Sequence, residues 1–233
     1  MFDRLKKTLS LPSFLGSAEP TQSGQLLPDS PIFKWASSRG YSYIGGQGES
    51  FTMIGKIAEK AWKLECGPTS RDYISGNELR ARAELEINED IAVMVMNRSL
   101  KQVLEKRAYQ MYTDTLQTVV EPNMPEEMRW LSTYPEVGWS GAPPQLWERY
   151  AIQAEERSHA IAWLTPALVD LLLSLPLTSS NGQLPFILML LRGKAYLRTQ
   201  YTSANLETLD HTALIFTAAC ESALGSLSLD IPV

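Results

Sequence analysis

Histidine chemistry has little material in this chain, because His159 and His211 are its only histidines. Glu156 and His159 have the Glu-x-x-His spacing that places two ligands on one helical face in carboxylate di-iron bundles. Such a site needs a second pair and two further glutamates, and His211, beside Asp210, is not in a second Glu-x-x-His. We therefore expect no metal site, and instead a solvated helix on which Glu155 pairs with His159 at i, i+4 spacing.

The two cysteines, Cys66 and Cys220, lie far apart in the chain and in unlike sequence contexts. A catalytic thiol needs a cationic neighbour and an open cleft; Arg71 could supply the charge, but no histidine lies in the same stretch. Alternation instead places Cys66 on an apolar strand face with Trp62 and Leu64. We predict that both thiols are buried and reduced, as is typical of a cytoplasmic protein.

Three glycines, Gly45, Gly46 and Gly48, lie between two apolar stretches and raise the question of a phosphate-binding loop. A dinucleotide fingerprint or a P-loop requires a helix after the glycines, whereas a second strand pattern begins here at Phe51. The spacing loosely echoes a protein-kinase glycine loop, but neither H-R-D-L-x-x-x-N nor D-F-G follows it. Residues 45–48 are therefore predicted to form a hairpin turn that binds no nucleotide, and we expect no cofactor.

The densest set of hydrogen-bonding side chains lies in residues 67–80 and in the strand that begins there. Arg71, Arg80 and Arg82 could bind a carboxylate or a phosphate through their planar guanidinium groups, with Glu84 on the same strand face. The alternative is a ladder of opposite charges on a wet sheet face, each pair contributing ~0.2–1 kcal/mol. We predict Arg71, Arg80, Arg82 and Glu84 as binding residues and leave the ladder open.

The strand pattern is clearest in residues 78–87, where apolar and charged side chains alternate strictly. The odd-numbered residues are apolar and the even-numbered ones are charged, which predicts one buried and one wet face. We expect the buried face to pack against a helix predicted from Leu100 to about Val119, because sequential elements are usually neighbours. The inner stripe predicted for that helix comprises Val103, Leu104, Ala108, Met111 and Thr115.

The remaining patterns complete an α+β fold, with an antiparallel sheet meander closed by the helix at 100–119. A helix is predicted from near Pro144 through Ile161, followed by a break at 165–166 and a short helix to about Leu175. Residues 185–202 predict either a β-hairpin joined at 192–194 or one bent strand. An amphipathic helix from about Asn205, with an apolar stripe that includes Cys220, ends the pattern.

We divide the chain into an N-terminal segment and flexible linker (1–31), a β-meander plus helix (32–120), and helices, a hairpin and a C-terminal helix (121–233). The last two ranges are expected to pack as one unit. Residues 2–11 could form a short amphipathic helix that makes peripheral contact with a membrane or a partner. Both halves end in an apolar strand and an amphipathic helix, and whether this is a duplication is left open.

The 233 residues carry 21 basic and 26 acidic side chains, a net charge of −5 that argues against nucleic acid as a partner. No apolar run reaches the length of about 18 residues that a transmembrane helix needs. Because no triad, metal cluster or cofactor motif can be assembled, we predict no catalytic residues. The sequence favours a cytoplasmic, non-enzymatic binding or adaptor module with a protein partner. The alternative is a hydrolase or transferase whose Arg/Glu site is assembled from residues distant in sequence.

Overall fold

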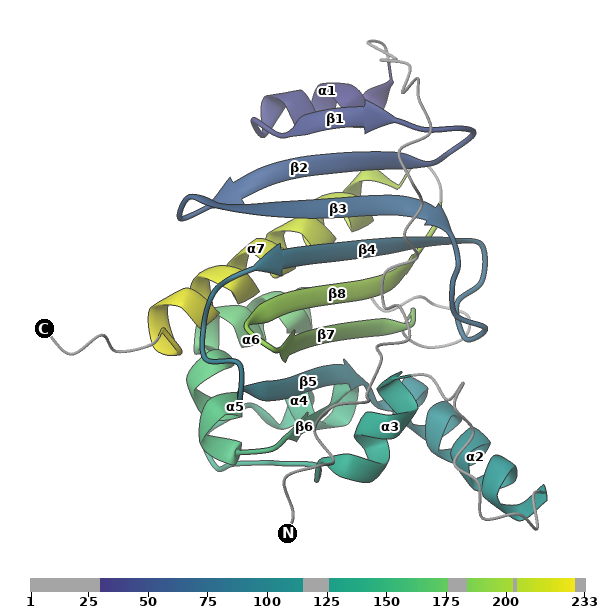
Figure 1. Ribbon diagram of the computed structural model, residues 1–233, viewed down its shortest axis with the longest axis vertical. Helices are drawn as coiled ribbons and strands as arrows, with labels where there is room; N and C mark the ends of the chain where they lie inside the picture. The colour runs from purple at the N-terminus through teal and green to yellow at the C-terminus, as the bar shows by residue number, and fades with distance from the viewer. Residues whose placement is uncertain (1–29, 115–125, 176–183, 203–204, 229–233) are drawn as a thin grey trace, which may run out of the picture.

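The computed structural model describes residues 30–114, 126–175, 184–202 and 205–228, which form an eight-stranded antiparallel sheet with helices on both faces (Figure 1). The predicted α+β fold class is confirmed. The amphipathic segment predicted at 2–11 and most of the linker predicted at 16–31 lie outside the described residues. Of that linker, Pro31 is instead the first residue of a helix that Ser30 caps by accepting a hydrogen bond from the Phe33 amide (3.0 Å).

The helices and strands alternate irregularly along the chain. The strands are β1 (Ser42–Gly45), β2 (Phe51–Ile57), β3 (Lys60–Pro68), β4 (Asn77–Glu84), β5 (Ala92–Asn97), β6 (Tyr150–Ala154), β7 (Phe186–Leu191) and β8 (Lys194–Tyr201). The helices are α1 (Pro31–Ser38), α2 (Arg98–Asp114), α3 (Glu126–Thr133), α4 (Pro144–Arg149), α5 (Arg157–Trp163), α6 (Pro166–Ser174) and α7 (Leu206–Ser226). No helix among these residues is long and apolar enough to cross a membrane.

The strand order is β1-β2-β3-β4-β8-β7-β5-β6, and every neighbouring pair is antiparallel. The first four strands form the predicted meander. The β7–β8 hairpin then lies between β4 and β5, so that strands from 32–120 and from 121–233 alternate in one sheet. The domain bounds set out above remain a prediction.

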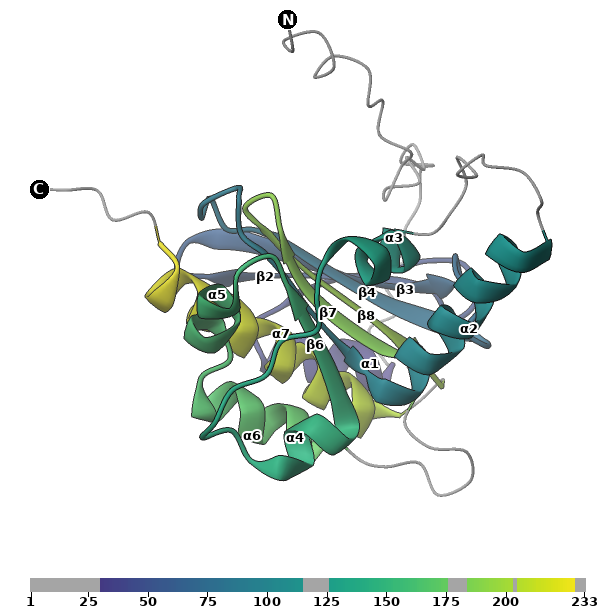
Figure 2. The same ribbon diagram turned by 90° about the horizontal axis from the view of Figure 1, so that it is seen from below.

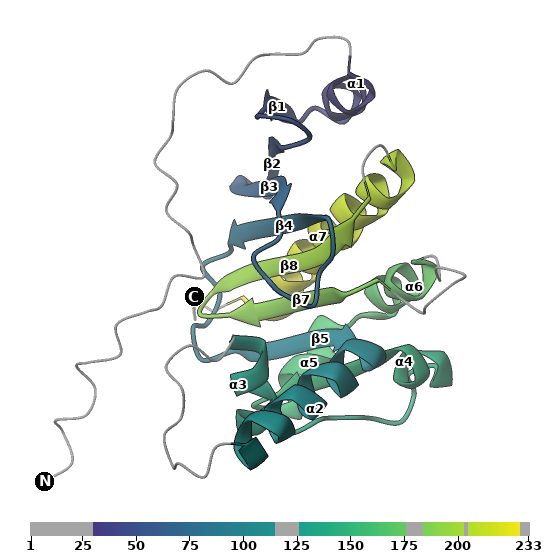
Figure 3. The same ribbon diagram turned by 90° about the vertical axis from the view of Figure 1, so that its right-hand side faces the viewer.

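One face of the sheet carries α1 and α4–α7, and the main core lies between them and the strands (Figures 2 and 3). The odd-numbered side chains of the predicted strand 78–87 are buried there as expected: Leu79, Ala81, Ala83, Leu85 and Ile87. β4 itself ends at Glu84 because the positive φ of Glu86 (57°) breaks the extended backbone. Leu85 and Ile87 nevertheless reach the same core.

The helix that covers this buried face is α7, and the prediction that the helix at 100–119 covers it was wrong. Trp62 of β3 packs against Phe216 of α7 with ring centroids 6.0 Å apart. α2 lies on the opposite face, where Leu100 and Leu104 contact the β5 methionines Met94 and Met96. The reason is the inserted hairpin, which places two strands, β8 and β7, between β4 and β5 and carries the helix after β5 away with it.

α2 and α3 cover only the β5–β7 side of this second face (Figure 1). Met128 and Trp130 of α3 complete a small apolar cluster with Ile187 and Met189 of β7. Val103, predicted on the inner stripe of α2, is instead 45% exposed. α2 therefore buries a narrower stripe than its sequence indicates, and no helix of the described residues covers the rest of this sheet face.

The predicted helix from Pro144 through Ile161 was also wrong, because β6 interrupts it. α4 ends at Arg149, and the next five residues, YAIQA, are all buried as a strand that pairs with β5. The side-chain hydroxyl of Tyr150 donates a hydrogen bond to the carbonyl of Leu172 on α6 (2.8 Å). Apolar residues in so short a segment fit a helical period as well as an extended one, and only the pairing with β5 decides between them.

The predicted hairpin turn at residues 45–48 is confirmed. The Gly46 amide donates to the carbonyl of Ser50 (2.8 Å) across the β1–β2 turn, and Gly48 takes a φ of 62°. The positive φ values of Arg192 and Gly193 reverse the chain between β7 and β8, which settles the open choice in favour of a hairpin. Whether residues 45–48 bind a nucleotide stays a prediction.

Both cysteines are free and buried, as predicted. Burial, followed by the charge of Glu49, raises the pKa of the Cys66 thiol to about 11. Burial likewise raises the pKa of Cys220 on α7. The native fold thus keeps both sulfurs in the unreactive thiol form.

Changing Gly55 to Ala should lower the free energy of unfolding by about 1–3 kcal/mol through overpacking. A Cβ at Gly55 would lie 2.5 Å from Nε1 of the buried Trp62, whose indole has no room to move. Gly138→Ala is the matched control, because a Cβ there meets nothing within 4 Å. Urea unfolding followed by tryptophan fluorescence measures both, and equal stabilities of the two variants would contradict this packing.

The Cys66 thiol should make stability fall at alkaline pH. Its folded pKa of about 11 lies above the ordinary 9.0, so its contribution is complete below about pH 9 and is lost as the pH rises to about 11. Unfolding free energies measured across this window should decline less steeply for Cys66→Ala than for the wild type. Identical slopes for the two proteins would show that the Cys66 thiol is not protected by the fold.

Candidate functional site

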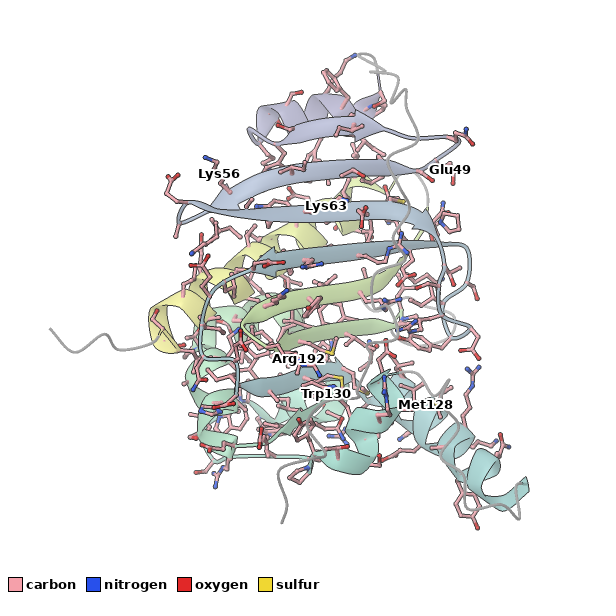
Figure 4. The ribbon with its side chains drawn as sticks, in the orientation of Figure 1. Glu49, Lys56, Lys63, Met128, Trp130 and Arg192 are labelled. Carbon is pink, nitrogen blue, oxygen red and sulfur yellow. The ribbon has the colours of Figure 1, made fainter. Side chains whose placement is uncertain are left out.

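β1 to β4 and the adjoining part of β8 have one face that no helix of the described residues covers, and we call it the open face (Figures 1 and 3). A hollow of about 550 Å³ lies on it, with a floor formed mainly by β3, β4 and β8 and with further lining residues from β2 and β7. The four residues predicted to bind, Arg71, Arg80, Arg82 and Glu84, all line this hollow. Figure 4 shows Lys63 on the open face of β3, and Met128 and Trp130 on α3 beside the lower strands.

Strand register sets which side chains stand directly opposite one another on the floor of the hollow. Lys63 of β3 faces Arg82 of β4, and Arg80 of β4 faces Arg198 of β8. Like charges in directly opposed positions are destabilising in an antiparallel pair. The floor therefore holds two cation–cation register pairs, and Glu65 opposite Arg80 is a register pair of opposite charge beside them.

The ion pairs of the floor run mostly along the strands rather than across them. Lys63 Nζ lies 2.6 Å from Glu65 Oε1 on the same strand, and Arg82 pairs with Glu84 on β4. Two cross-strand pairs of opposite charge join β4 to β8, Glu84 with Lys194 (3.2 Å) and Glu78 with Arg198. The ladder interpretation thus describes the two ends of the β4–β8 pair, and the centre is different.

At one end of the hollow the face is buried, and the prediction that Glu78 points to water was wrong. Glu78 is fully buried, and the loop after β3 folds over it, because the backbone amide of Ser70 donates to Glu78 Oε2 (2.9 Å). Arg198 donates from Nη1 to Glu78 and to the Ser70 hydroxyl (2.8 Å). Alternation in a sequence shows only which face of the sheet a side chain lies on. Whether that side chain is exposed to solvent depends on whether a loop covers it.

Glu127 of α3 is also fully buried and joins the same network. Arg71 Nε donates to both carboxylate oxygens of Glu127 (3.0 and 3.2 Å), and the Tyr73 hydroxyl donates to Oε1 (3.1 Å). Arg198 Nε lies 3.8 Å from the same oxygen. We call these four charged residues, Arg71, Glu78, Glu127 and Arg198, the arginine–glutamate cluster.

The cluster contains two guanidinium groups and two carboxylates, so it is neutral as a unit. Burial lowers the pKa of Arg71, but the charge of Glu127 and its hydrogen bond outweigh burial and leave this pKa raised. Burial lowers the pKa of Arg198, although an arginine stays protonated in proteins. Burial and then the Glu127 charge raise the pKa of Tyr73, which therefore acts as a hydrogen-bond donor.

Arg80 differs from the other arginines of the hollow. Its Nε is buried and has no hydrogen-bond partner among the described residues, and its guanidinium makes no ion pair with them. The guanidinium lies over Gly67, where a Cβ would be 3.6 Å from Nη2. Glu65 stands opposite Arg80 in register but bonds Lys63 instead.

The histidines lie away from the hollow, on α5 and α7. His159 Nε2 is 3.7 Å from a carboxylate oxygen of Glu156, and the predicted pairing with Glu155 was wrong, because α5 begins at Arg157 and leaves Glu155 outside the helix. The described part of the chain contains no group of three or more His, Cys, Asp or Glu residues that could hold a metal ion.

Sequence reasoning missed Lys63, Tyr196 and Arg198 as residues of the hollow. The signal was present, because alternation in β3 and β8 places polar side chains on the same side as those of β4. What the sequence did not contain was the register that sets β8 beside β4.

No protein-family model matches the chain, and no curated protein matches it. A solved structure, that of the mycobacterial trehalose monomycolate transport factor A, TtfA, is similar with a TM-score of 0.44 and 10% sequence identity. The similarity covers 86% of this chain and 95% of that one. No conclusion about function follows from a likeness of this size.

Changing Glu127 to Gln should lower the free energy of unfolding by about 3–5 kcal/mol, because it leaves the partly buried Arg71 without its counter-charge. Glu84→Gln is the matched control; its carboxylate is 57% exposed, and its loss should change stability by no more than about 1 kcal/mol. Urea unfolding of both variants makes the comparison. A Glu127 variant as stable as the Glu84 variant would show that the cluster does not anchor α3.

Proposed function

We propose that this protein is a non-enzymatic binding module whose hollow on the open face accommodates an acidic segment of a partner protein. The observation that carries the proposal is that two pairs of like-charged residues stand opposite each other in register on the floor, Lys63 with Arg82 and Arg80 with Arg198. An arrangement that disfavours the free sheet becomes favourable when an anion lies over it.

The surroundings of the hollow support a peptide segment with apolar as well as acidic side chains. Ile54 lines the hollow and is 38% exposed, and Ile44 of β1, 48% exposed, belongs to the adjoining edge strand. Lys63 remains 51% exposed beside them, within reach of a ligand from solvent. A cationic floor next to exposed isoleucines matches a segment in which acidic and apolar residues alternate.

The charge state of the carboxylates favours binding over catalysis. A hydrogen bond from Arg82, then one from Lys194, lowers the pKa of Glu84, which makes it a poor proton donor. Glu65 is committed to Lys63, and Glu78 and Glu127 to the arginine–glutamate cluster. The hydrolase or transferase remains an alternative hypothesis, and no observation on the described residues favours it. The two buried free thiols support the proposal of a cytoplasmic location.

A short fluorescent peptide that alternates glutamate with valine, capped at both ends, provides the test by fluorescence anisotropy. The wild-type protein should bind it, with an affinity that falls as salt is added. The double variant Lys63→Gln, Arg82→Gln should bind about tenfold more weakly or worse, since charged hydrogen bonds are lost.

Two controls make this result specific. A peptide with glutamine in place of glutamate should not bind, and the variant Lys34→Gln, Arg157→Gln removes two exposed cations outside the hollow without effect. Equal binding by both double variants would overturn the proposal. Binding of anionic phospholipid vesicles without binding of the acidic peptide would overturn it as well.

A further inference from the structure

We infer that Arg80 is the residue of the hollow that recognises a carboxylate, and that the partner supplies it as an aspartate or glutamate side chain. This inference rests on the proposed function and adds which cation makes the specific contact. It follows from which charges of the hollow already have partners, from the burial of Arg80 Nε, and from the chemistry of the guanidinium group.

Each other cation that lines the hollow has a carboxylate of its own. Lys63 pairs with Glu65 and Arg82 with Glu84, while Arg71 pairs with Glu127 and Arg198 with Glu78. Five cations line the hollow, and these pairs account for all of them except Arg80. Counted over the described residues, the hollow is therefore short of one negative charge, and the shortfall is at Arg80.

The position of Arg80 makes this shortfall unfavourable without a ligand. Its Nε is buried without a hydrogen-bond partner in the described part of the chain, and Arg198 stands directly opposite it. An arginine cannot relieve such a site by losing its proton, as a lysine can. Buried donors are nearly always satisfied, so a site like this one calls for an acceptor from outside.

A carboxylate fits this site better than a phosphate does. One positive charge is left over, which a monoanionic carboxylate neutralises and a dianionic phosphate exceeds. The two oxygens of a carboxylate can accept from a guanidinium in a bidentate arrangement. The side chain of Arg80 is only partly exposed, so the carboxylate has to reach it on a side chain that enters the hollow.

Arg80→Lys tests the inference with the capped acidic peptide as the probe. The lysine keeps the positive charge but lacks the planar guanidinium group that can bind a carboxylate in a bidentate arrangement, so affinity should fall about tenfold or more. Arg157→Lys is the matched control and should bind as the wild type does, because Arg157 is exposed and does not line the hollow. Equal binding by the two lysine variants would overturn the inference while leaving the proposed function intact.

Stability distinguishes a binding role for Arg80 from a structural one. Without peptide, Arg80→Gln should melt at the same temperature as the wild type or higher, since it removes an unpaired charge beside Arg198. A clear loss of thermal stability in Arg80→Gln would mean that Arg80 is a structural residue and would overturn the inference.

An NMR measurement on the wild-type protein distinguishes binding of a carboxylate at Arg80 from binding of the peptide as a whole. Acetate should shift the Nε–Hε NMR signal of Arg80, assigned by its loss in Arg80→Lys, whether or not the peptide binds. Absence of a shift overturns the inference. Displacement of the acidic peptide by inorganic phosphate but not by acetate at the same concentration would also overturn it, because the site would then prefer a phosphate. If acetate shifts the signal but the peptide fails to bind, the proposed function fails alone.

Discussion

The pairing of β8 with β4 is the contact on which the rest of the structure depends. It joins the N-terminal meander to the strands of the second half of the chain, along the whole length from Asn77↔Tyr201 to Glu84↔Lys194. This pairing brings together residues about 120 positions apart, so its formation requires closure of a long loop. Without it, α7 would not reach β3, and Arg198 would not lie beside Arg80. The core on one face and the hollow on the other are thus two results of one strand pairing.

The two faces of the sheet at this pairing show how the same sheet can be stable and still hold charged side chains that are not fully neutralised. On the covered face, apolar side chains of β3, β4 and β8 pack against α7, which supplies the hydrophobic stabilisation. On the open face, the arginine–glutamate cluster is neutral and hydrogen-bonded, whereas the central cations are crowded. Sites that combine a well-packed scaffold with a local electrostatic conflict are where binding residues are expected, because a ligand can relieve the conflict.

The sequence predicted well whatever depends on neighbours along the chain. Alternation identified the strands up to β4 and their buried residues. The residue types at 45–48 predicted the first turn, and those at 192–194 offered a turn as one of two alternatives. The sequence-based predictions failed where a residue's conformation or burial depends on a partner distant in the chain. β6 is a strand only because β5 pairs with it, and Glu78 is buried only because Ser70 and Arg198 surround it. The same limit applies to the site. Arg71, Arg80, Arg82 and Glu84 could be selected by type and spacing, but the like-charged pairs depend on register, which no local pattern contains.

The arginine–glutamate cluster has a further consequence for how Arg80 would bind. A buried ion pair contributes little net stability compared with apolar residues of similar size, but it fixes the geometry of its members. Here Glu78 and Ser70 hold the Arg198 guanidinium in place, and Glu127 holds that of Arg71. Two of the cations around Arg80 are therefore ordered before any ligand arrives. An anion that enters the hollow loses less of its binding free energy to the ordering of side chains, and the structural role of the cluster thereby supports the binding role of Arg80.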